Sequence, residues 1–223
     1  MARRSCQNVV IAAATRTAVG RAKKGSLATV RPEDMGAAVV KELLRRVEQI
    51  APAEVDDIVM GCTFPEAEQG MNIARLIGLR AGLPDSVPGE TINRFCSSGL
   101  QSVVHGIYSI MAGENEVVIA GGVESMSMVP MTGVKYSPTP YLVANFPQVF
   151  TSMGLTAENL VERYAVTRQD QDEFALRSHQ LAVKAVEAGL FKAEIVPIEV
   201  EIVAPDQDGG VSRRSFIFER DEG

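Results

Sequence analysis

The amino-acid sequence predicts an α/β fold with a mostly parallel or mixed sheet, helices on both faces of it, and an α-rich subdomain inserted after it. Short apolar runs alternate with amphipathic helical patterns along residues 1–124, which is the order that parallel sheets require. From Ser125 onward the sequence becomes irregular and rich in proline and methionine before two further helical stretches begin. The length of 223 residues is enough to bury a sizeable core. We therefore expect two domains, residues 1–124 and 125–223.

The first domain begins with a strand, a loop and a helix. The apolar run from Asn8 to Ala14 predicts the strand, and Pro32 to Gln49 predicts the helix. Pro32 suits a first helical turn, because its missing N–H would have no partner there and the two acids after it meet the positive end of the helix dipole. The following elements keep this alternation: strands at Val55 to Cys62, Val87 to Arg94 and Glu116 to Ala120, and helices at Asn72 to Ala81 and after Cys96.

The second domain is predicted to be mostly helical. Two helices are expected at Thr156 to Tyr164 and Arg168 to Ala188, the second ending before Gly189. A hairpin is expected to follow, because Glu194 to Val203 and Ser215 to Phe218 flank an Asp208-Gly209 turn signal.

Cys96 is the candidate catalytic residue. A predicted strand runs into it and a helix runs out, with apolar residues at the spacing of one buried face: Leu100, Val103, Val104, Ile107, Tyr108 and Met111. Unpaired amides and the helix dipole stabilise a negative sulfur, so we expect a larger thiolate fraction than in a free cysteine, whose pKa is about 8.5. The alternative is that Cys96 is a small buried apolar residue, and its position alone leaves both interpretations open.

The other two cysteines are expected to be structural. Cys6 lies in a polar leader, and Cys62 ends a predicted buried strand. Three cysteines at unrelated spacings form neither a disulfide framework nor a zinc-binding pattern, which favours a reducing compartment. We expect no metal site.

Neither of the two histidines is a good general base for Cys96. His105 lies nine residues further along the same predicted helix, so a rise of about 1.5 Å per residue places it roughly 13 Å away along the axis. His179 lies in the middle of a long, mostly polar helix. The sequence therefore offers a nucleophile without a base.

Composition excludes several classes of protein. The formal net charge is −6, there is no tryptophan, and basic residues do not cluster, so nucleic acid is not expected as a partner. No apolar run approaches the roughly 20 residues that span a bilayer, and the apolar run near the start is shorter than the core of a signal peptide. We expect a cytoplasmic protein with no membrane span.

Several motifs resemble those of the thiolase family. Asn93 to Gln101 resembles the acyl-cysteine motif of thiolases, and Ala120 to Ser127 resembles the strand and loop that follow it there. Further matches occur in the same order: Arg16 to Gly20, Asn72 to Arg75 with Ala81 to Pro84, Met153 to Asn159, and Gln171 to Ala175 with Ser178 to Gln180. The resemblance implies a thiolase-like layered fold, of which this sequence matches the first half (1–124) and most of the CoA-contacting loop domain (125–223).

The family implies an acyl transfer through a thioester on Cys96. A 3-ketoacyl-CoA is cleaved by free CoA to acetyl-CoA and a shortened acyl-CoA, or the reverse Claisen condensation occurs. CoA is then a co-substrate, and no permanently bound cofactor is expected. Met153 matches a position that packs on the pantetheine arm of CoA, although a methionine that fills a gap in the core is the alternative.

In thiolases the second half of the chain supplies the activating histidine, a second cysteine and an asparagine. None has a counterpart in this sequence, so we expect the chain as given to be incomplete and inactive alone. Thiolases pair their first halves across the sheet, and the strand at Glu116 to Ala120 would otherwise present an open edge. A homo-oligomer, either a dimer or a tetramer, is therefore expected.

Other functions remain open at this point. Phe95 with Ser97 and Ser98 resembles the degradative thiolases of fatty acid β-oxidation more than the biosynthetic acetoacetyl-CoA thiolases, which are the first alternative. A decarboxylating ketosynthase would not explain the matches at Met153-Gly154 and Ser178 to Gln180. The alternative from another class is a non-catalytic thiolase-like chain that binds acyl-CoA or assembles without turnover.

Overall fold

The computed structural model describes residues 8–205 and 210–222. The chain divides into two compact units, the first made of Met1–Val134 with Glu194–Gly223 and the second of Lys135–Ala193. Cys6 and the Asp208-Gly209 turn lie outside the described residues. The expected division into 1–124 and 125–223 was based on sequence character and family resemblance, and it stays a prediction.

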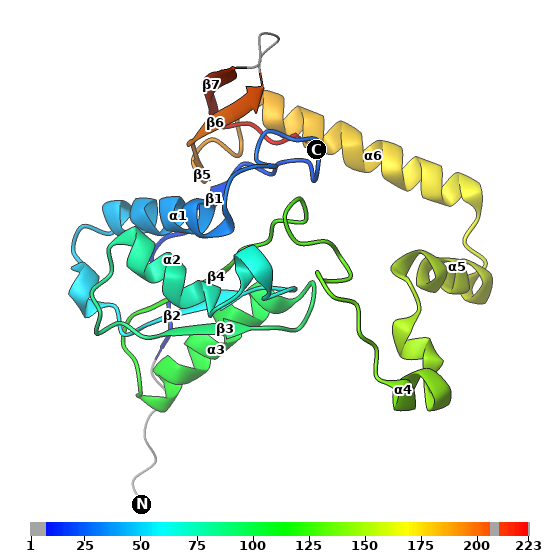
Figure 1. The fold of residues 1–223 in the computed structure, drawn as a ribbon, viewed down its shortest axis with the longest axis horizontal. Helices are drawn as coiled ribbons and strands as arrows, with labels where there is room; N and C mark the ends of the chain where they lie inside the picture. Colours follow the sequence, from blue (N-terminus) through cyan, green and yellow to red (C-terminus); the bar gives the residue numbers. More distant parts are fainter. Residues whose placement is uncertain (1–7, 206–209, 223) are drawn as a thin grey trace, which may run out of the picture. The chain divides into compact units, whose positions relative to one another are not determined.

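A three-stranded parallel sheet forms the centre of the first unit. β2 (Asp57–Gly61) lies between β3 (Gly89–Ile92) and β4 (Val118–Gly122). The helices α1 (Pro32–Arg46) and α2 (Ile73–Ala81) lie on one side of the sheet, and α3 (Ser98–Ala112) lies on the other (Figure 1). The predicted α/β fold with helices on both faces is confirmed.

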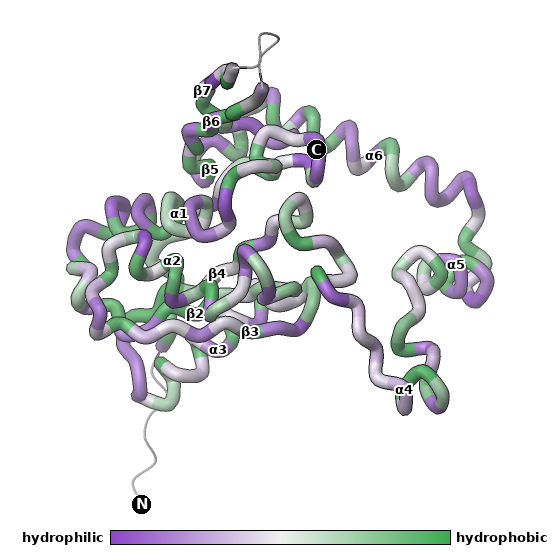
Figure 2. Tube along the Cα trace, in the orientation of Figure 1, coloured by the Kyte–Doolittle hydropathy of each residue, from purple (hydrophilic) through white to green (hydrophobic). Residues whose placement is uncertain are grey.

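The alternation of side chains along β2 explains this layering. Ile58 and Met60 belong to a buried apolar cluster with residues of α1 and α2, including Val40 and Ile77. Gly61 instead faces the first turn of α3. Figure 2 shows hydrophobic colouring along β2 and β4, as expected for strands covered on both faces. Short connections complete this part of the unit, among them the single-turn helices η1 (Pro52–Glu54) and η2 (Ala67–Gln69).

A hairpin from the end of the chain joins the first unit. β6 (Ile198–Pro205) and β7 (Val211–Phe218) are antiparallel, and β5 (Ile195–Val196) pairs in parallel with β1 (Arg16–Thr17). A second buried cluster ties the hairpin to α1 and to the loop before it through six residues: Ala18, Leu27, Met35, Ile198, Val200 and Phe218. The predicted hairpin is confirmed.

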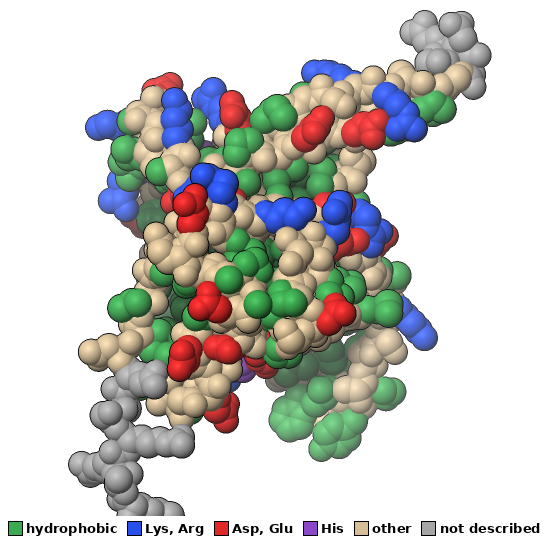
Figure 3. Space-filling view, turned by 90° about the vertical axis from the view of Figure 1, so that its left-hand side faces the viewer, with side chains coloured by type: hydrophobic (Ala, Val, Ile, Leu, Met, Phe, Trp, Pro, Cys, Tyr) green, Lys and Arg blue, Asp and Glu red, His purple; other side chains and the backbone are tan. Residues whose placement is uncertain are grey.

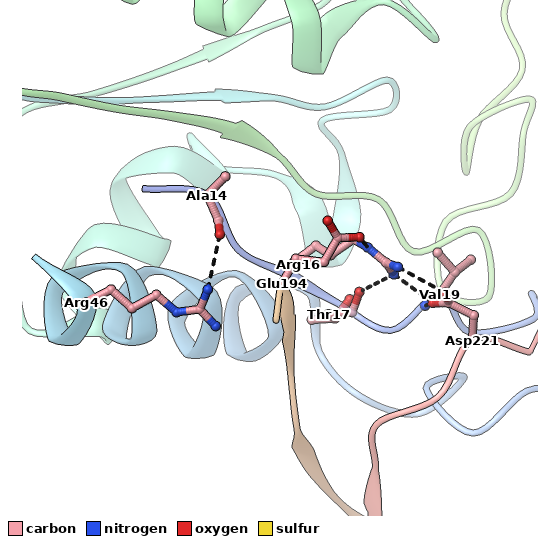
Figure 4. A network of polar contacts seen from close by, with 7 residues as sticks. All are labelled: Ala14, Arg16, Thr17, Val19, Arg46, Glu194 and Asp221. Carbon is pink, nitrogen blue, oxygen red and sulfur yellow. Dashed lines mark hydrogen bonds and ion pairs between the residues drawn. The ribbon is translucent and has the colours of Figure 1, made fainter. Parts of the chain in front are cut away.

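Arg16 fastens the two ends of the chain together. Its guanidinium donates to Glu194 at 2.7 Å and forms two hydrogen bonds with Asp221, at 2.7 and 3.0 Å (Figure 4). The Asp221 carboxylate also accepts the Val19 N–H at 2.7 Å. The hydrogen bond from Arg16 keeps the pKa of Asp221 below its usual range. A planar guanidinium suits this paired geometry, so the clamp explains why residues far apart in the sequence share one unit.

The second unit is helical. It contains α4 (Pro140–Asn145), a short 3-10 helix η3 (Pro147–Phe150), α5 (Met153–Tyr164) and α6 (Arg168–Glu187). Thr167 and Asp170 form a reciprocal capping box at the start of α6. None of the described residues in these helices is buried, and hydrophobic and hydrophilic turns alternate along α6 (Figure 2). The two predicted long helices are confirmed.

The strand expected at Asn8 to Ala14 is wrong. These residues have no regular structure, and Val10 and Ile11 are 81% and 80% exposed. A strand requires a neighbour to complete its hydrogen-bond ladder, and within the described residues no strand pairs with this segment. The segment instead lines an open groove of about 610 Å³ with residues of α1, α3 and β4, which we call the apolar groove.

The buried face expected for α3 is also wrong. The buried positions are Ser98, Ser102 and Gly106, whereas Leu100 and Tyr108 are 71% and 64% exposed. Small residues let the helix approach β4 closely: the Ser102 hydroxyl donates to the carbonyl of Gly121 at 2.6 Å. A Cβ on Gly106 would lie 3.1 Å from the side chain of Val118. Large apolar side chains cannot fit that contact, so Leu100 and Tyr108 are exposed, whereas Val103, Val104 and Ile107 of the expected face are half-buried.

Charged side chains on the first unit are mixed in sign. Figure 3 shows basic side chains interspersed with acidic ones on the face it views. The Arg45 Nε lies 2.7 Å from a carboxylate oxygen of Glu42, and the Arg80 Nε lies 2.7 Å from a carboxylate oxygen of Asp34. No helix within the described ranges is long and apolar enough to cross a membrane.

Two adjacent carboxylates at the start of β2 predict opposite effects on stability. Asp56 accepts the N–H groups of Glu116 and Val117 at 2.7 and 2.9 Å, which lowers its pKa. Burial raises the pKa of Asp57. Asp56→Asn should therefore lower the melting temperature at pH 7, and Asp57→Asn should raise it. The Asp57→Asn difference should shrink as the pH falls through the raised pKa of folded Asp57 toward 3.8, whereas the Asp56→Asn difference should shrink only below 3.8, as the pH approaches the lowered pKa of folded Asp56. Melting curves at pH 7 and pH 3.5 check this, and two shifts of the same sign at pH 7 would contradict it.

Candidate functional site

Cys96 lies in the turn between β3 and α3, and its thiol is exposed. The neighbouring strands β2 and β4 end in Gly61 and Gly122 at the same edge of the sheet. Ligands collect beyond the carboxyl ends of parallel strands, so this edge is the expected place for a site. Cys96 is one residue before Ser97, the N-cap of α3, as the sequence predicts.

Direct backbone packing fixes the first turn of α3 against the sheet. A Cβ on Gly61 would lie 2.3 Å from the carbonyl carbon of Ser98 and 2.5 Å from the nitrogen of Gly99. A Cβ on Gly122 would lie 3.1 Å from the Gly61 oxygen and 3.4 Å from the Gly99 Cα. We call the packing of Gly61, Ser98, Gly99 and Gly122 the glycine contact. Cys96 is positioned by it, because the turn leads directly into this part of the helix.

The turn that carries Cys96 is strained and hydrogen-bonded. Phe95 has a φ of 48°, a left-handed conformation that costs a non-glycine residue roughly 1–3 kcal/mol. The Asn93 side-chain oxygen accepts the Phe95 N–H at 2.8 Å. The Ser98 hydroxyl accepts the Arg94 N–H at 2.9 Å and donates to the Phe95 carbonyl at 2.5 Å. These short side chains hold the strained residue immediately before the thiol.

Neither histidine is bonded to the nucleophile. His105 is half-buried on α3, and its Nδ1 lies 3.4 Å from the Glu90 carboxylate on β3. His179 is exposed on α6, in the second unit. In the part of the chain that the structure describes, no hydrogen bond joins the Cys96 sulfur to a base. The same part contains no group of three His, Cys, Asp or Glu side chains that could hold a metal ion.

Cys62 is buried at the end of β2, as the sequence predicts. Burial, and secondarily the negative charge of Glu124, raises the pKa of the Cys62 thiol to about 12. Its sulfur lies 4.0 Å from a Glu124 oxygen, so the neutral thiol can act as a weak donor to the carboxylate. Cys62 is therefore protonated at neutral pH and unsuited to nucleophilic attack.

Sequence reasoning missed three residues at this edge. Gly61 is required by the glycine contact, and its only signal was its place at the end of a predicted strand. The other two are Gln69 and Glu124: the side-chain nitrogen of Gln69 donates to a carboxylate oxygen of Glu124 at 2.6 Å. Glu124 belongs to the Ala120 to Ser127 motif, but no pattern in the sequence indicated that Gln69 is buried. Met153, the first residue of α5, is 69% exposed, and its contact with CoA stays a prediction.

The fold and site define a class: a parallel α/β unit that presents an exposed cysteine at the carboxyl edge of its sheet. Among solved structures the chain is similar to the acetyl-CoA acetyltransferase of Bacillus anthracis, with a TM-score of 0.80 and 39% identity. The match covers 96% of this chain and 54% of that one.

Sequence comparison identifies the family. The model of the thiolase N-terminal domain matches residues 9–222, so the chain belongs to the thiolase family and corresponds to its N-terminal half. It is 51% identical over 217 residues to a 3-ketoacyl-CoA thiolase of Bacillus subtilis (strain 168), covering 97% of this chain and 55% of the relative. It is 45% identical to a 3-ketoacyl-CoA thiolase of Photorhabdus laumondii, covering 94% and 53%. The chain thus spans about half the length of the curated relatives it matches.

The difference between the two described cysteines predicts selective modification. Limiting iodoacetamide at neutral pH should label Cys96 well before Cys62, because Cys96 is exposed and burial keeps Cys62 protonated. Peptide mapping of the folded protein measures both. Cys62→Ala should leave the labelling rate of Cys96 unchanged and serves as the control. Faster labelling of Cys62 in the folded protein would contradict the assignment.

Proposed function

We propose that this chain carries the acyl-accepting cysteine of a 3-ketoacyl-CoA thiolase. The observation that carries the proposal is the exposed Cys96, held before α3 at the carboxyl edge of the sheet in a chain of this family. The Cys96 thiolate attacks the 3-keto carbonyl of a 3-ketoacyl-CoA. The carbon–carbon bond breaks, the leaving carbanion is protonated and departs as acetyl-CoA, and the shortened acyl group remains on sulfur.

Free CoA completes the reaction. Its thiolate attacks the thioester, takes the acyl group and regenerates Cys96, so the two steps balance without any further cofactor. Sulfur suits both steps because its ionised form is strongly nucleophilic and it is a good leaving group from a thioester. The same steps in reverse give a Claisen condensation.

The proposal includes a second half that completes the site. The described residues offer Cys96 no base, and the similar 3-ketoacyl-CoA thiolases are nearly twice as long as this chain. Leu100 and Tyr108 on α3 are exposed, and the apolar groove beside β4 is open. Such apolar surface favours burial against a further layer of protein. That half would supply the histidine and second cysteine that the family resemblance implies.

The remaining features of the proposal follow the family. Phe95, Ser97 and Ser98 support degradative cleavage of longer acyl chains, with acyl-CoA and CoA as partners and Met153 against the pantetheine arm of CoA. The open edge of β4 supports a homo-oligomer, which light scattering checks. Cysteine usage supports a cytoplasmic location, which cell fractionation checks.

The isolated chain should show little or no thiolysis of acetoacetyl-CoA or longer 3-ketoacyl-CoA. Joining it to the C-terminal half of the Bacillus subtilis relative, as one chain or by co-expression, should restore turnover. In the restored enzyme Cys96→Ser should abolish activity, because an alcohol is far less ionised than a thiol and is a poorer leaving group. Loss of the 3-ketoacyl-CoA enolate absorbance on addition of CoA measures the reaction.

Matched variants distinguish the alternatives. His105→Asn and His179→Asn should keep most of the restored activity, whereas Met153→Ala should raise the KM for CoA. Binding of acyl-CoA by the restored protein without any turnover would favour a non-catalytic role. Robust turnover by residues 1–223 alone, abolished by either histidine variant, would overturn the proposal that the second half supplies the base.

A further inference from the structure

A buried polar cluster lies behind the turn that carries Cys96. Gln69 is fully buried at the end of η2, with an exposed fraction of 0%. Its side-chain nitrogen donates to Glu124 at 2.6 Å and to the carbonyl of Phe64 at 2.9 Å. Its side-chain oxygen accepts the Ser125 N–H at 2.5 Å. Both amide donors and the amide oxygen are thus engaged, which is the arrangement that a buried polar side chain requires.

Glu124 connects this cluster to the chain that leaves β2. One carboxylate oxygen accepts from Gln69, and the other accepts the Thr63 N–H at 2.6 Å. Hydrogen bonds to an ionised acceptor are short and strong, and they are stronger still where water is excluded. Glu124 therefore fixes the backbone at Thr63 relative to the segment after β4.

Thr63 in turn contacts both sides of the strained turn before Cys96. Its hydroxyl donates to the Phe95 carbonyl at 3.2 Å, and its carbonyl accepts from the Asn93 side chain at 2.8 Å. The adjacent Phe64 ring meets the Phe95 ring edge-on, with centroids 6.4 Å apart. A continuous path of contacts thus runs from Gln69 and Glu124 through Thr63 to the residue before the nucleophile.

We propose that Glu124 and Gln69 are positioning residues that hold Thr63 and, through it, the strained Phe95 turn in the geometry that presents Cys96. A left-handed non-glycine residue persists only where its surroundings over-determine it, and this cluster supplies part of that constraint from outside the turn. Neither side chain touches the reacting atoms. The consequence for catalysis rests on the proposed thiolase function, but the positioning itself does not.

The cluster requires a carboxylate at residue 124. The three groups that contact this carboxylate are all donors: the Thr63 N–H, the Gln69 amide and, weakly, the Cys62 thiol. Glu124→Gln has nearly the same shape, but it replaces one acceptor with an NH₂ group that must face a donor. The exposed Glu114, in the loop before β4, offers the same substitution as a matched control.

Hydrogen exchange on the chain itself tests the positioning. Glu124→Gln should speed exchange of the amides at residues 93–98 by about ten-fold, because a lost hydrogen bond to a charged group loosens the turn. Exchange in α1 and in the β6–β7 hairpin should stay as in the unmodified chain, and Glu114→Gln should change nothing. Unchanged exchange at 93–98 in Glu124→Gln would overturn the proposal, and so would an equal increase everywhere, which signals general destabilisation.

Thr63→Val gives a second, milder test that cuts the path at one bond. It removes the hydroxyl bond to Phe95 but keeps the Thr63 N–H for Glu124, so exchange should rise at 93–98 and not at Ser125. If Glu124→Gln does not fold, this variant decides: unchanged exchange at 93–98 overturns the proposal.

Kinetics of the restored full-length enzyme read out the catalytic consequence. Glu124→Gln should lower kcat roughly 10- to 100-fold, the cost of misplacing a reacting group, with KM changed less than about two-fold. A higher KM with an unchanged kcat would overturn the proposed consequence for catalysis. If the unmodified full-length enzyme has no thiolysis while exchange at 93–98 responds as expected, the proposed function fails and the positioning stands.

Discussion

The close backbone contact between the first turn of α3 and the ends of β2 and β4 is the constraint on which the first unit depends. A Cβ on Gly61 would lie 2.3 Å from the Ser98 carbonyl carbon, and a Cβ on Gly122 would lie 3.1 Å from the Gly61 oxygen. Backbone cannot move aside as a flexible side chain can, so this packing sets the distance between helix and sheet. It also sets where the Cys96 turn emerges, because α3 begins two residues after the cysteine. Ser102 and Gly106 extend the same close approach along the helix.

Two polar arrangements secure the chain around this contact. The Gln69–Glu124 pair joins the segments after β2 and β4, and the Arg16 clamp fastens Glu194 and Asp221 to β1. Carboxylates in both arrangements accept several donors at once, which makes each a junction between separate segments. The apolar groove and the outward face of α3 are the surfaces that this packing leaves uncovered. Their position beside β4 is consistent with a chain that spans about half the length of its relatives.

Elements with strong local signals could be predicted from the sequence. Pro32 and Gly82 mark the start of α1 and the end of α2, and the capped helices α5 and α6 agree with the structure within a few residues. The prediction of a strand at residues 8–14 was wrong because apolar residues indicate only that a segment is stabilised by burial, whereas a strand also needs a neighbouring backbone to pair with. The buried face of α3 failed because small residues, not the largest apolar ones, decide a close helix–sheet contact. The motif around Cys96 indicated the nucleophile, but the Gln69–Glu124 pair depends on segments 55 residues apart and left no local pattern.

Replacing one glycine at a time with alanine, Gly61 at the end of β2 or Gly99 in the first turn of α3, tests the role of the glycine contact most directly. Gly61→Ala would place a methyl carbon 2.3 Å from the Ser98 carbonyl carbon, a severe overlap, whereas a Cβ on Gly99 has no atom within 4 Å. The measurement is the free energy of unfolding in urea for both variants. The account predicts a loss of at least about 2 kcal/mol for Gly61→Ala, since an overpacked backbone contact cannot relax by changing rotamers. Gly99→Ala should stay within about 1 kcal/mol of the unmodified chain, because alanine is the better helix former. Equal stability of Gly61→Ala and the unmodified chain would contradict the account.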